Sequence, residues 1–157
     1  MYRKLAVIGA FCAALLASAN AEIIATQTVE KEVVSLDAQG RETISRLAAE
    51  KVTPGETVVY SLKYKNTSTQ PAEDLVLVMP VPDEVGYVEG SIEGAPASIS
   101  FSADGGETYV ARGRLTIVEN GEPRAARGDE ITHIKWTLSA PVAPEGEGWV
   151  SYKGVLR

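Results

Sequence analysis

An alternating stretch from Val58 to Lys65 constrains the fold of this chain more than any other feature. Apolar or aromatic residues occupy every second position on one side, namely Val58, Tyr60, Leu62 and Tyr64. Val59, Ser61, Lys63 and Lys65 lie between them. Such alternation predicts a β-strand with one face on a core and the other in water. Pro54 and Gly55 mark the turn that leads into it. The stretch indicates an architecture and carries no chemistry.

The first 21 residues have the pattern of a secretory signal peptide. Arg3 and Lys4 precede an apolar run from Leu5 to Leu16, and Ala19-Asn20-Ala21 has the small-x-small form of a cleavage site. We therefore expect a leader helix over 1–21, cleavage after Ala21, and a periplasmic or secreted protein. The alternative is a retained anchor, but the run is shorter than the roughly 20 residues that span a bilayer.

Lipoprotein processing is not expected at Cys12, because the bulky Phe11 precedes it. Cleavage after Ala21 would remove this cysteine, the only one in the sequence. The remaining 136 residues suffice for one domain with a core, and we expect no disulfide.

The charge of the expected mature chain disfavours two classes of partner. Without Arg3 and Lys4 it has 13 basic and 21 acidic residues, a net charge of −8. An acidic surface repels phosphate backbones and anionic lipid heads, so we expect no nucleic acid and no stable membrane insertion after cleavage.

Strand signals dominate the rest of the chain. The predicted strands cover, in order, Ile23 to Leu36 (polar enough for a sheet edge), Arg41 to Leu47, Val58 to Lys65, Leu75 to Met79, Ser98 to Ser102, Thr108 to Val110, Arg114 to Glu119, Ile131 to Leu138 and Gly148 to Leu156. The continuously apolar Leu75 to Met79 suggests a strand covered on both sides or in mid-sheet. Asn120-Gly121 predicts a type I′ hairpin turn.

These signals predict an all-β fold, an antiparallel two-sheet immunoglobulin-like sandwich of about seven to nine strands without a disulfide. The expected organisation is a signal peptide over 1–21, an N-terminal strand or hairpin extension over 22–50, and the sandwich over 51–157. We expect six side chains between the sheets: Tyr60, Leu62, Leu77, Trp136, Leu138 and Tyr152.

Several segments together resemble a known family. They are Val52-Thr-Pro-Gly-Glu-Thr-Val-Val-Tyr60, Tyr64-Lys-Asn66, Met79-Pro80, Gly86-Tyr-Val-Glu-Gly-Ser91, Ser102-Ala-Asp-Gly-Gly106, Ile131-Thr-His-Ile-Lys-Trp136, and Val142-Ala-Pro-Glu-Gly146 before Gly148. Their order and spacing over residues 50 to 157 are similar to the conserved-repeat domain of bacterial surface proteins, domain of unknown function 11. The resemblance implies an exported immunoglobulin-like module of the cell envelope, from a family without shared catalytic residues.

Two short motifs invite sharper interpretations. Ser102-x-Asp104-Gly-Gly-x-Thr108 fits the Asp-box hairpin of secreted β-proteins, which we interpret as a structural turn. Arg127-Gly-Asp129 is an integrin-type tripeptide, but three-residue matches are common by chance. We interpret the second motif as the turn before a strand.

No pattern predicts catalytic, cofactor-binding or metal-binding residues. Calcium is the best metal candidate, yet Asp83-Glu84 and Asp129-Glu130 are isolated acidic pairs without ligand spacing. Zinc is a poorer candidate, because the mature chain has no cysteine and a single histidine. His133 falls on the polar face of its strand, and no nucleophile elbow is present.

Two function classes remain open. The first is a non-catalytic structural or protein-interaction module of the envelope. It would bind an envelope protein, or its own copies, through a sheet edge. The second is a polysaccharide-binding or enzyme-accessory module that uses Trp149, on the face opposite Val150 and Tyr152, and the tyrosines. We expect no enzymatic activity and no cofactor in either case.

Overall fold

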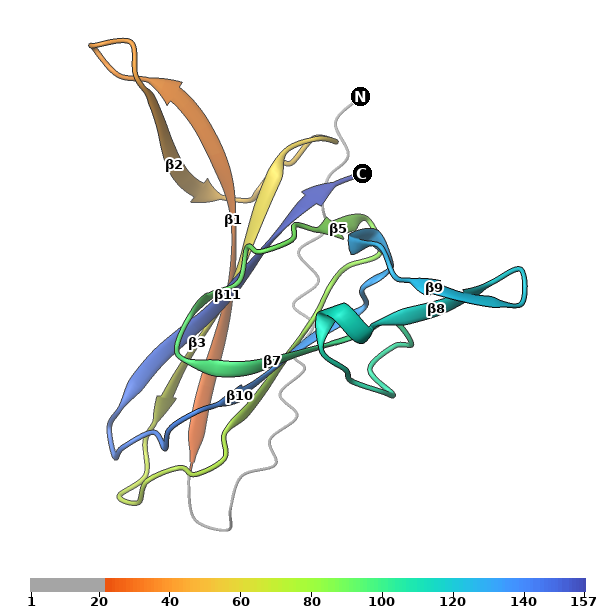
Figure 1. Cartoon of the computed structure of the whole chain (residues 1–157). Helices are drawn as coiled ribbons and strands as arrows, with labels where there is room; N and C mark the ends of the chain where they lie inside the picture. Colours follow the sequence, from red (N-terminus) through yellow and green to blue (C-terminus); the bar gives the residue numbers. More distant parts are fainter. Residues whose placement is uncertain (1–21) are drawn as a thin grey trace.

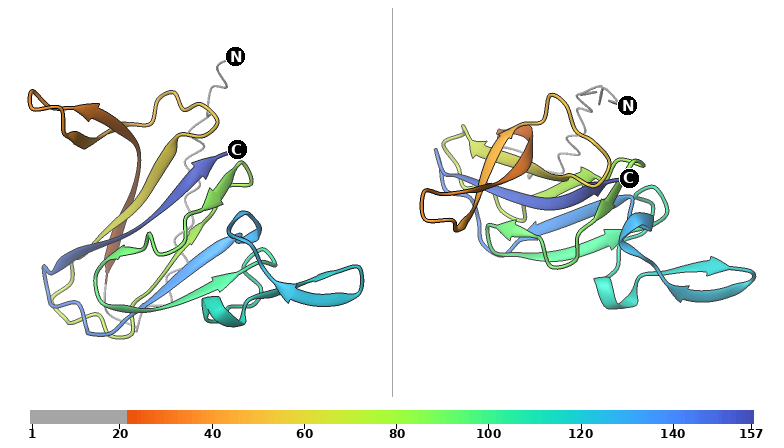
Figure 2. Two further views of the ribbon diagram at one scale, coloured as in Figure 1. Left: turned by 45° about the horizontal axis from the view of Figure 1, so that its top comes forward. Right: turned by 90° about the horizontal axis from the view of Figure 1, so that it is seen from above.

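The computed structural model describes residues 22–157, so the expected leader and its cleavage site lie outside the described residues. The described chain is an antiparallel β-sandwich in which two sheets face each other across one core (Figures 1 and 2). The predicted all-β, two-sheet fold without a disulfide is confirmed. Among these residues no helix is long and apolar enough to cross a membrane.

The larger sheet has the strand order β2-β1-β3-β11-β5, and β6 pairs with the same strand as β5. Its strands are β1 (Ile23–Leu36), β2 (Glu42–Ala48), β3 (Thr57–Asn66), β5 (Val85–Tyr87), β6 (Glu93–Gly94) and β11 (Glu147–Leu156). The long strand β1 pairs with β3 over Ile23 to Lys31 and with β2 over Glu30 to Leu36. The N-terminal segment is therefore a strand of the sandwich at one end and half of a projecting hairpin at the other.

The smaller sheet consists of β4 (Val76–Pro80), β10 (His133–Leu138) and β7 (Ala97–Ser102), with β10 in the middle. The prediction that the apolar run of β4 is a central or doubly covered strand is wrong, because β4 is an edge strand. Leu77 and Met79 are buried, whereas Val76 and Val78 point outward and are half-buried. The outward valines lie opposite Thr137 and Lys135, whose side chains can shield them in part.

A second hairpin, β8 (Thr116–Glu119) and β9 (Glu122–Ala125), lies between two short 3₁₀ segments, η1 (Arg112–Arg114) and η2 (Gly128–Glu130). Asn120 and Gly121 have φ angles of 55° and 85°, as a type I′ turn requires. The described residues form eleven strands, more than the predicted seven to nine, because β5, β6 and β9 are too short to leave a clear sequence pattern. The predicted strand Thr108 to Val110 is wrong, since Val110 forms only an isolated bridge with Phe101.

The core follows the predicted alternation. Tyr60, Leu77, Trp136, Leu138 and Tyr152 are buried, and Leu62 is partly buried against them. The rings of Tyr60 and Tyr152 stack with centroids 5.0 Å apart. The Tyr152 hydroxyl donates a 2.7 Å hydrogen bond to the Pro80 carbonyl of the other sheet. Burial raises the pKa of Tyr60 to about 12.

The outer face of β3 differs from the sequence prediction. Val59 and Ser61 were expected to meet water, but both are buried. Glu32 of β1 and Lys153 of β11 form a 2.7 Å ion pair, and these strands flank β3. Their long side chains therefore cross the outer face of β3. Charged residues cover this face with their aliphatic stems, which a period-2 pattern does not reveal.

Candidate interaction surface

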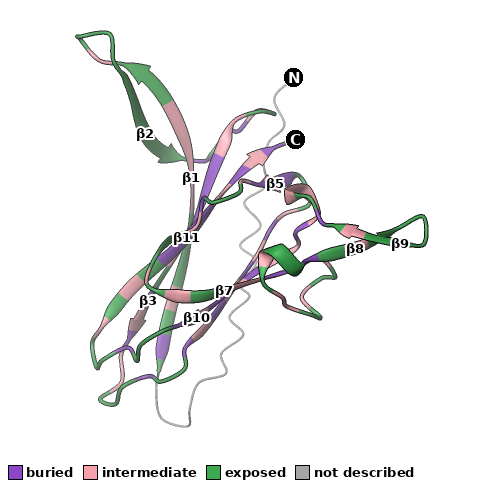
Figure 3. Cartoon of the chain, viewed as in Figure 1, coloured by how far each residue is buried: buried purple, intermediate pink, exposed green. Residues whose placement is uncertain are grey.

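The hairpin of β1 and β2 projects from the sandwich (Figure 1). β2 is exposed throughout, whereas β1 is half-buried from Glu30 to Val33 and exposed from Val34 to Leu36 (Figure 3). Asp37 closes its turn: the carboxylate accepts hydrogen bonds from the backbone of Gln39 (2.8 Å) and Arg41 (2.9 Å). These bonds lower the pKa of Asp37. The hairpin thus has a defined turn, although it extends beyond the part of β1 that pairs with β3.

Three aliphatic side chains form a strip on one face of this hairpin. Val34, Leu36 and Ile44 are 60%, 69% and 63% exposed, and Val34 lies directly opposite Ile44. Leu47, on the other face, is also exposed. An isolated two-stranded hairpin is only marginally stable in water, and these aliphatic groups are poorly shielded by the chain itself. The strip has the character of a contact surface.

The free edge of the hairpin presents a specific set of backbone groups. The amide of Asp37 donates to the Arg41 carbonyl, and the amide of Ala49 donates to the Val29 carbonyl. Hydrogen-bonded pairs alternate along an antiparallel ladder, so the odd-numbered residues of β2 bond to β1. The amides and carbonyls of Glu42, Ile44 and Arg46 therefore point away from β1. They form an open edge that can accept another strand.

Ion pairs fix the base of the hairpin to the larger sheet. Arg46 lies 3.7 Å from both Glu32 and Glu93, and Lys153 lies 2.7 Å from Glu32. Lys31 forms a further pair with Glu56 at 3.4 Å. These contacts join β1 and β2 to β6 and β11, so the direction in which the hairpin projects is set by the sandwich.

Most other strand edges are short or occupied. β4 has five residues and ends at Pro80, which cannot donate to a ladder. Phe101 of β7 already exchanges two backbone hydrogen bonds with Val110. β9 contains Pro123. The first half of β1, Ile23 to Val29, is open on the side that β2 leaves free, but its exposed side chains are mainly polar.

The sequence predicts a free edge along the polar first strand, which is correct only for the half before Glu30. Beyond that residue β2 covers β1, and the edge moves to β2. The alternating Val34, Leu36 and Ile44 were visible in the sequence. Their exposure was not, because the same alternation is expected of a strand that packs on a core.

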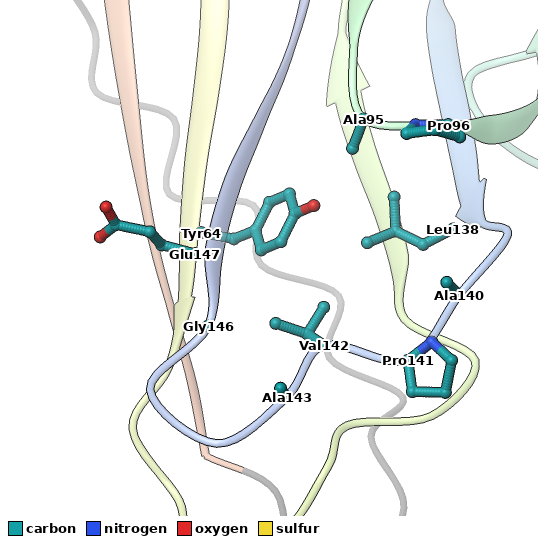
Figure 4. Close-up of a pocket in the computed structure, with 10 residues that line it drawn as sticks. All are labelled: Tyr64, Ala95, Pro96, Leu138, Ala140, Pro141, Val142, Ala143, Gly146 and Glu147. Carbon is teal, nitrogen blue, oxygen red and sulfur yellow. The ribbon is translucent and has the colours of Figure 1, made fainter.

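A shallow groove of about 240 Å³ opens between the two sheets at the opposite end of the sandwich (Figure 4). Leu138, Val142 and the ring of Tyr64 form its apolar wall, and Pro96 and Pro141 lie at its rim. The described lining residues include one carboxylate, Glu147. The groove offers apolar contact and little polar specificity.

The Asp-box segment forms a closed turn, as predicted. The Asp104 carboxylate accepts hydrogen bonds from the Ser102 hydroxyl (2.6 Å), the Glu107 amide (3.1 Å) and the amide and hydroxyl of Thr108. These bonds, that of Ser102 first, hold the pKa of Asp104 far below its usual range. Gly105 and Gly106 both have positive φ. Both carboxylate oxygens are engaged in shaping the turn.

The Arg127-Gly-Asp129 tripeptide lies at the start of η2, and its charged groups bond to each other. The Arg127 guanidinium lies 3.3 Å from Asp129 and 2.8 Å from Glu130, and Asp129 also pairs with Arg157 at 3.4 Å. A hydrogen bond from Arg124 to Glu130 is the main cause that lowers the Glu130 pKa to about 2. Integrin-type recognition needs the guanidinium and carboxylate held apart, and here they are paired.

The remaining candidates are dispersed. His133 is half-buried, and burial lowers its pKa. Its Nδ1 lies 3.2 Å from the Thr132 hydroxyl. Across residues 22–157 no three His, Cys, Asp or Glu side chains cluster in a way that could hold a metal ion. Trp149 is 41% exposed on the outer face of β11, where Lys63 of β3 lies beside it.

Comparison with known proteins adds no identity: no family model, no curated protein and no solved structure matches this chain.

Proposed function

We propose that this protein is an exported, non-catalytic module of the bacterial cell envelope that binds another protein through the free edge of β2. The observation that carries the proposal is the projecting β1–β2 hairpin, with an aliphatic strip beside an open row of backbone donors and acceptors. Strand addition uses these two features: main-chain hydrogen bonds give affinity, and alternate side chains give specificity. The β-sandwich fold is compatible with a module of this kind.

Export to the periplasm or the medium is supported by the leader pattern over residues 1–21, and an envelope role by the resemblance of residues 50 to 157 to exported conserved-repeat domains. We expect protein recovered from its native host to begin at Glu22, because cleavage follows Ala19-Asn20-Ala21. Intact-mass spectrometry of the periplasmic, membrane and medium fractions measures this. Recovery of a chain that starts at Met1 in the membrane fraction would contradict the prediction.

A proline at the outward-pointing residue Ile44 tests binding at the edge. Its amide points away from β1, so Ile44→Pro removes an edge donor without breaking a bond of the hairpin. We expect Ile44→Pro to abolish capture of the partner from envelope extract by the immobilised protein. Ile44→Thr, which keeps the amide and the β-branched shape, should weaken capture only a few-fold.

Val34→Pro is the matched control, because its amide points to the opposite edge of the same hairpin. It should leave capture near the wild-type level. Equal loss in the two proline variants would show that the hairpin itself, and not the β2 edge, is required. Circular dichroism of each variant confirms that the sandwich is intact.

A polysaccharide-binding function is the alternative, and the exposed indole of Trp149 favours it. Aromatic faces stack on apolar faces of sugar rings, and the outer surface of β11 leaves this one accessible. Glycan-array binding that Trp149→Ala abolishes and Ile44→Pro leaves intact would support this alternative over strand addition.

A further inference from the structure

We infer that the occupant of the β2 edge is the β2 strand of a second copy of this chain, in an antiparallel register centred on Ile44. This inference rests on the proposed function, since it names the partner for the same edge. It follows from three properties of β2: the direction of its backbone groups, the distribution of its charges and the position of its aliphatic residues.

The backbone permits a two-fold pairing at this residue. Glu42, Ile44 and Arg46 all direct their amide and carbonyl groups outward. When two such edges meet antiparallel with Ile44 opposite Ile44, each outward residue falls in a hydrogen-bonded pair. The ladder then has about six intermolecular hydrogen bonds. A register shifted by one residue would place outward groups against residues whose amides already bond to β1.

The charges of the edge complement each other in this register. Glu42 of each copy lies directly opposite Arg46 of the other, on the same face as Ile44. Side chains directly opposite in an antiparallel pair are close enough to form an ion pair. Glu42 takes part in none of the ion pairs found within residues 22–157, and both contacts of Arg46 are as long as 3.7 Å. On the other face, Thr43 meets Ser45 of the second copy.

The aliphatic strip becomes continuous when the copies pair. Val34 lies opposite Ile44 within each hairpin, so the four-stranded arrangement places the four side chains in one row across the sheet. A two-stranded hairpin is thereby converted into a four-stranded sheet, which is the more stable form. The contact is small compared with standard interfaces, so the pairing should depend on protein concentration.

Cysteine cross-linking tests the register. The full chain is expressed with its own leader and with Cys12→Ser, so that the added cysteine is the only one. Ile44→Cys places two thiols on either side of the two-fold axis with Cα atoms about 5.5 Å apart, within the range that a disulfide bridges. We expect a covalent dimer under mild oxidation. Val34→Cys is the control: its exposure is similar, but its two copies in the dimer would lie about 14 Å apart, so it should give no covalent dimer.

A charge exchange tests the pairing independently. Glu42→Arg places Arg opposite Arg in a dimer of identical chains, and Arg46→Glu places Glu opposite Glu. Arg46→Glu also puts a carboxylate beside Glu32 and Glu93 of its own chain, so Glu42→Arg is the cleaner single variant. Each variant alone should be monomeric at concentrations where the wild-type chain dimerises in analytical ultracentrifugation. A mixture of the two variants restores both opposite-charge pairs and should dimerise. Wild-type behaviour of each variant alone, or no dimer from the mixture, would overturn the inference.

Failure here is distinguishable from failure of the proposed function. A chain that neither cross-links at Ile44→Cys nor sediments as a dimer, yet captures an envelope partner that Ile44→Pro abolishes, overturns the self-pairing and leaves the edge as a binding site. A chain that shows no self-pairing and also captures no partner through this edge overturns the inference and the proposed function together.

Discussion

Trp136→Ala is expected to lower the free energy of unfolding by about 3–5 kcal/mol, as large-to-small core substitutions do. Trp136 is fully buried in the middle strand of the smaller sheet, between Leu77 of β4 and Ile99 of β7. Among the described residues its buried indole N–H has no hydrogen-bond partner. Its contribution is therefore apolar packing, and urea denaturation followed by tyrosine fluorescence measures the loss.

His133→Ala is the matched control on the same strand. His133 is half-buried on the opposite face, and its substitution should cost about 0.5–1 kcal/mol. Trp136→Phe removes the unpaired N–H together with part of the ring, so its cost should lie well below that of alanine. Equal losses for Trp136→Ala and His133→Ala would contradict the assignment of the inner face.

The sandwich was predictable because its central strands carry a strong period-2 signal. β10 buries strictly alternate residues, whereas β3 and β11 also bury residues between their core-facing positions, namely Val59, Ser61 and Ser151. The position of β4 at the edge of its sheet was not predictable, because a run of apolar residues is compatible with an edge strand or a central strand. The buried Val59 was missed for a related reason: a pattern within one strand does not show that Glu32 and Lys153 join above it.

The candidate surface depends on where one strand changes partner. The sequence predicts both strands of the first hairpin, but it does not specify that β1 pairs with β3 only as far as Lys31 and with β2 from Glu30 onward. The position at which β1 changes its partner from β3 to β2 determines which edge is open and which aliphatic side chains are exposed. Strand pairing between segments distant in sequence follows from the packing of the whole sandwich, and local propensity does not encode it.

Asn66 shows the largest polar contribution that we expect. Its side chain is fully buried, and its amide group donates to the carbonyls of Gln70 (2.7 Å), Val142 (3.0 Å) and Ala143 (3.3 Å). Its oxygen accepts from the amide and hydroxyl of Ser68. One side chain therefore holds together the two loops at the groove end of the sandwich. Removing it in Asn66→Ala should cost on the order of 2–3 kcal/mol, because the hydrogen bonds that join the two loops are lost together, although each of the three carbonyls keeps a second donor.

Asn66→Asp keeps the shape and should be more harmful at neutral pH, by about 3–5 kcal/mol, because a carboxylate oxygen then faces three carbonyl oxygens. The protonated acid can donate, so the pKa of this group should rise in the folded state above its unfolded value of about 3.9. A raised pKa means that the variant is most stable below about pH 4 and loses stability as pH rises through the folded pKa. Urea denaturation of variant and wild type at pH 4 and pH 7 measures the difference. Asn120→Asp, the same substitution in an exposed turn, should show little effect at either pH. A pH-independent cost for Asn66→Asp would show that its amide does not donate to these carbonyls in solution.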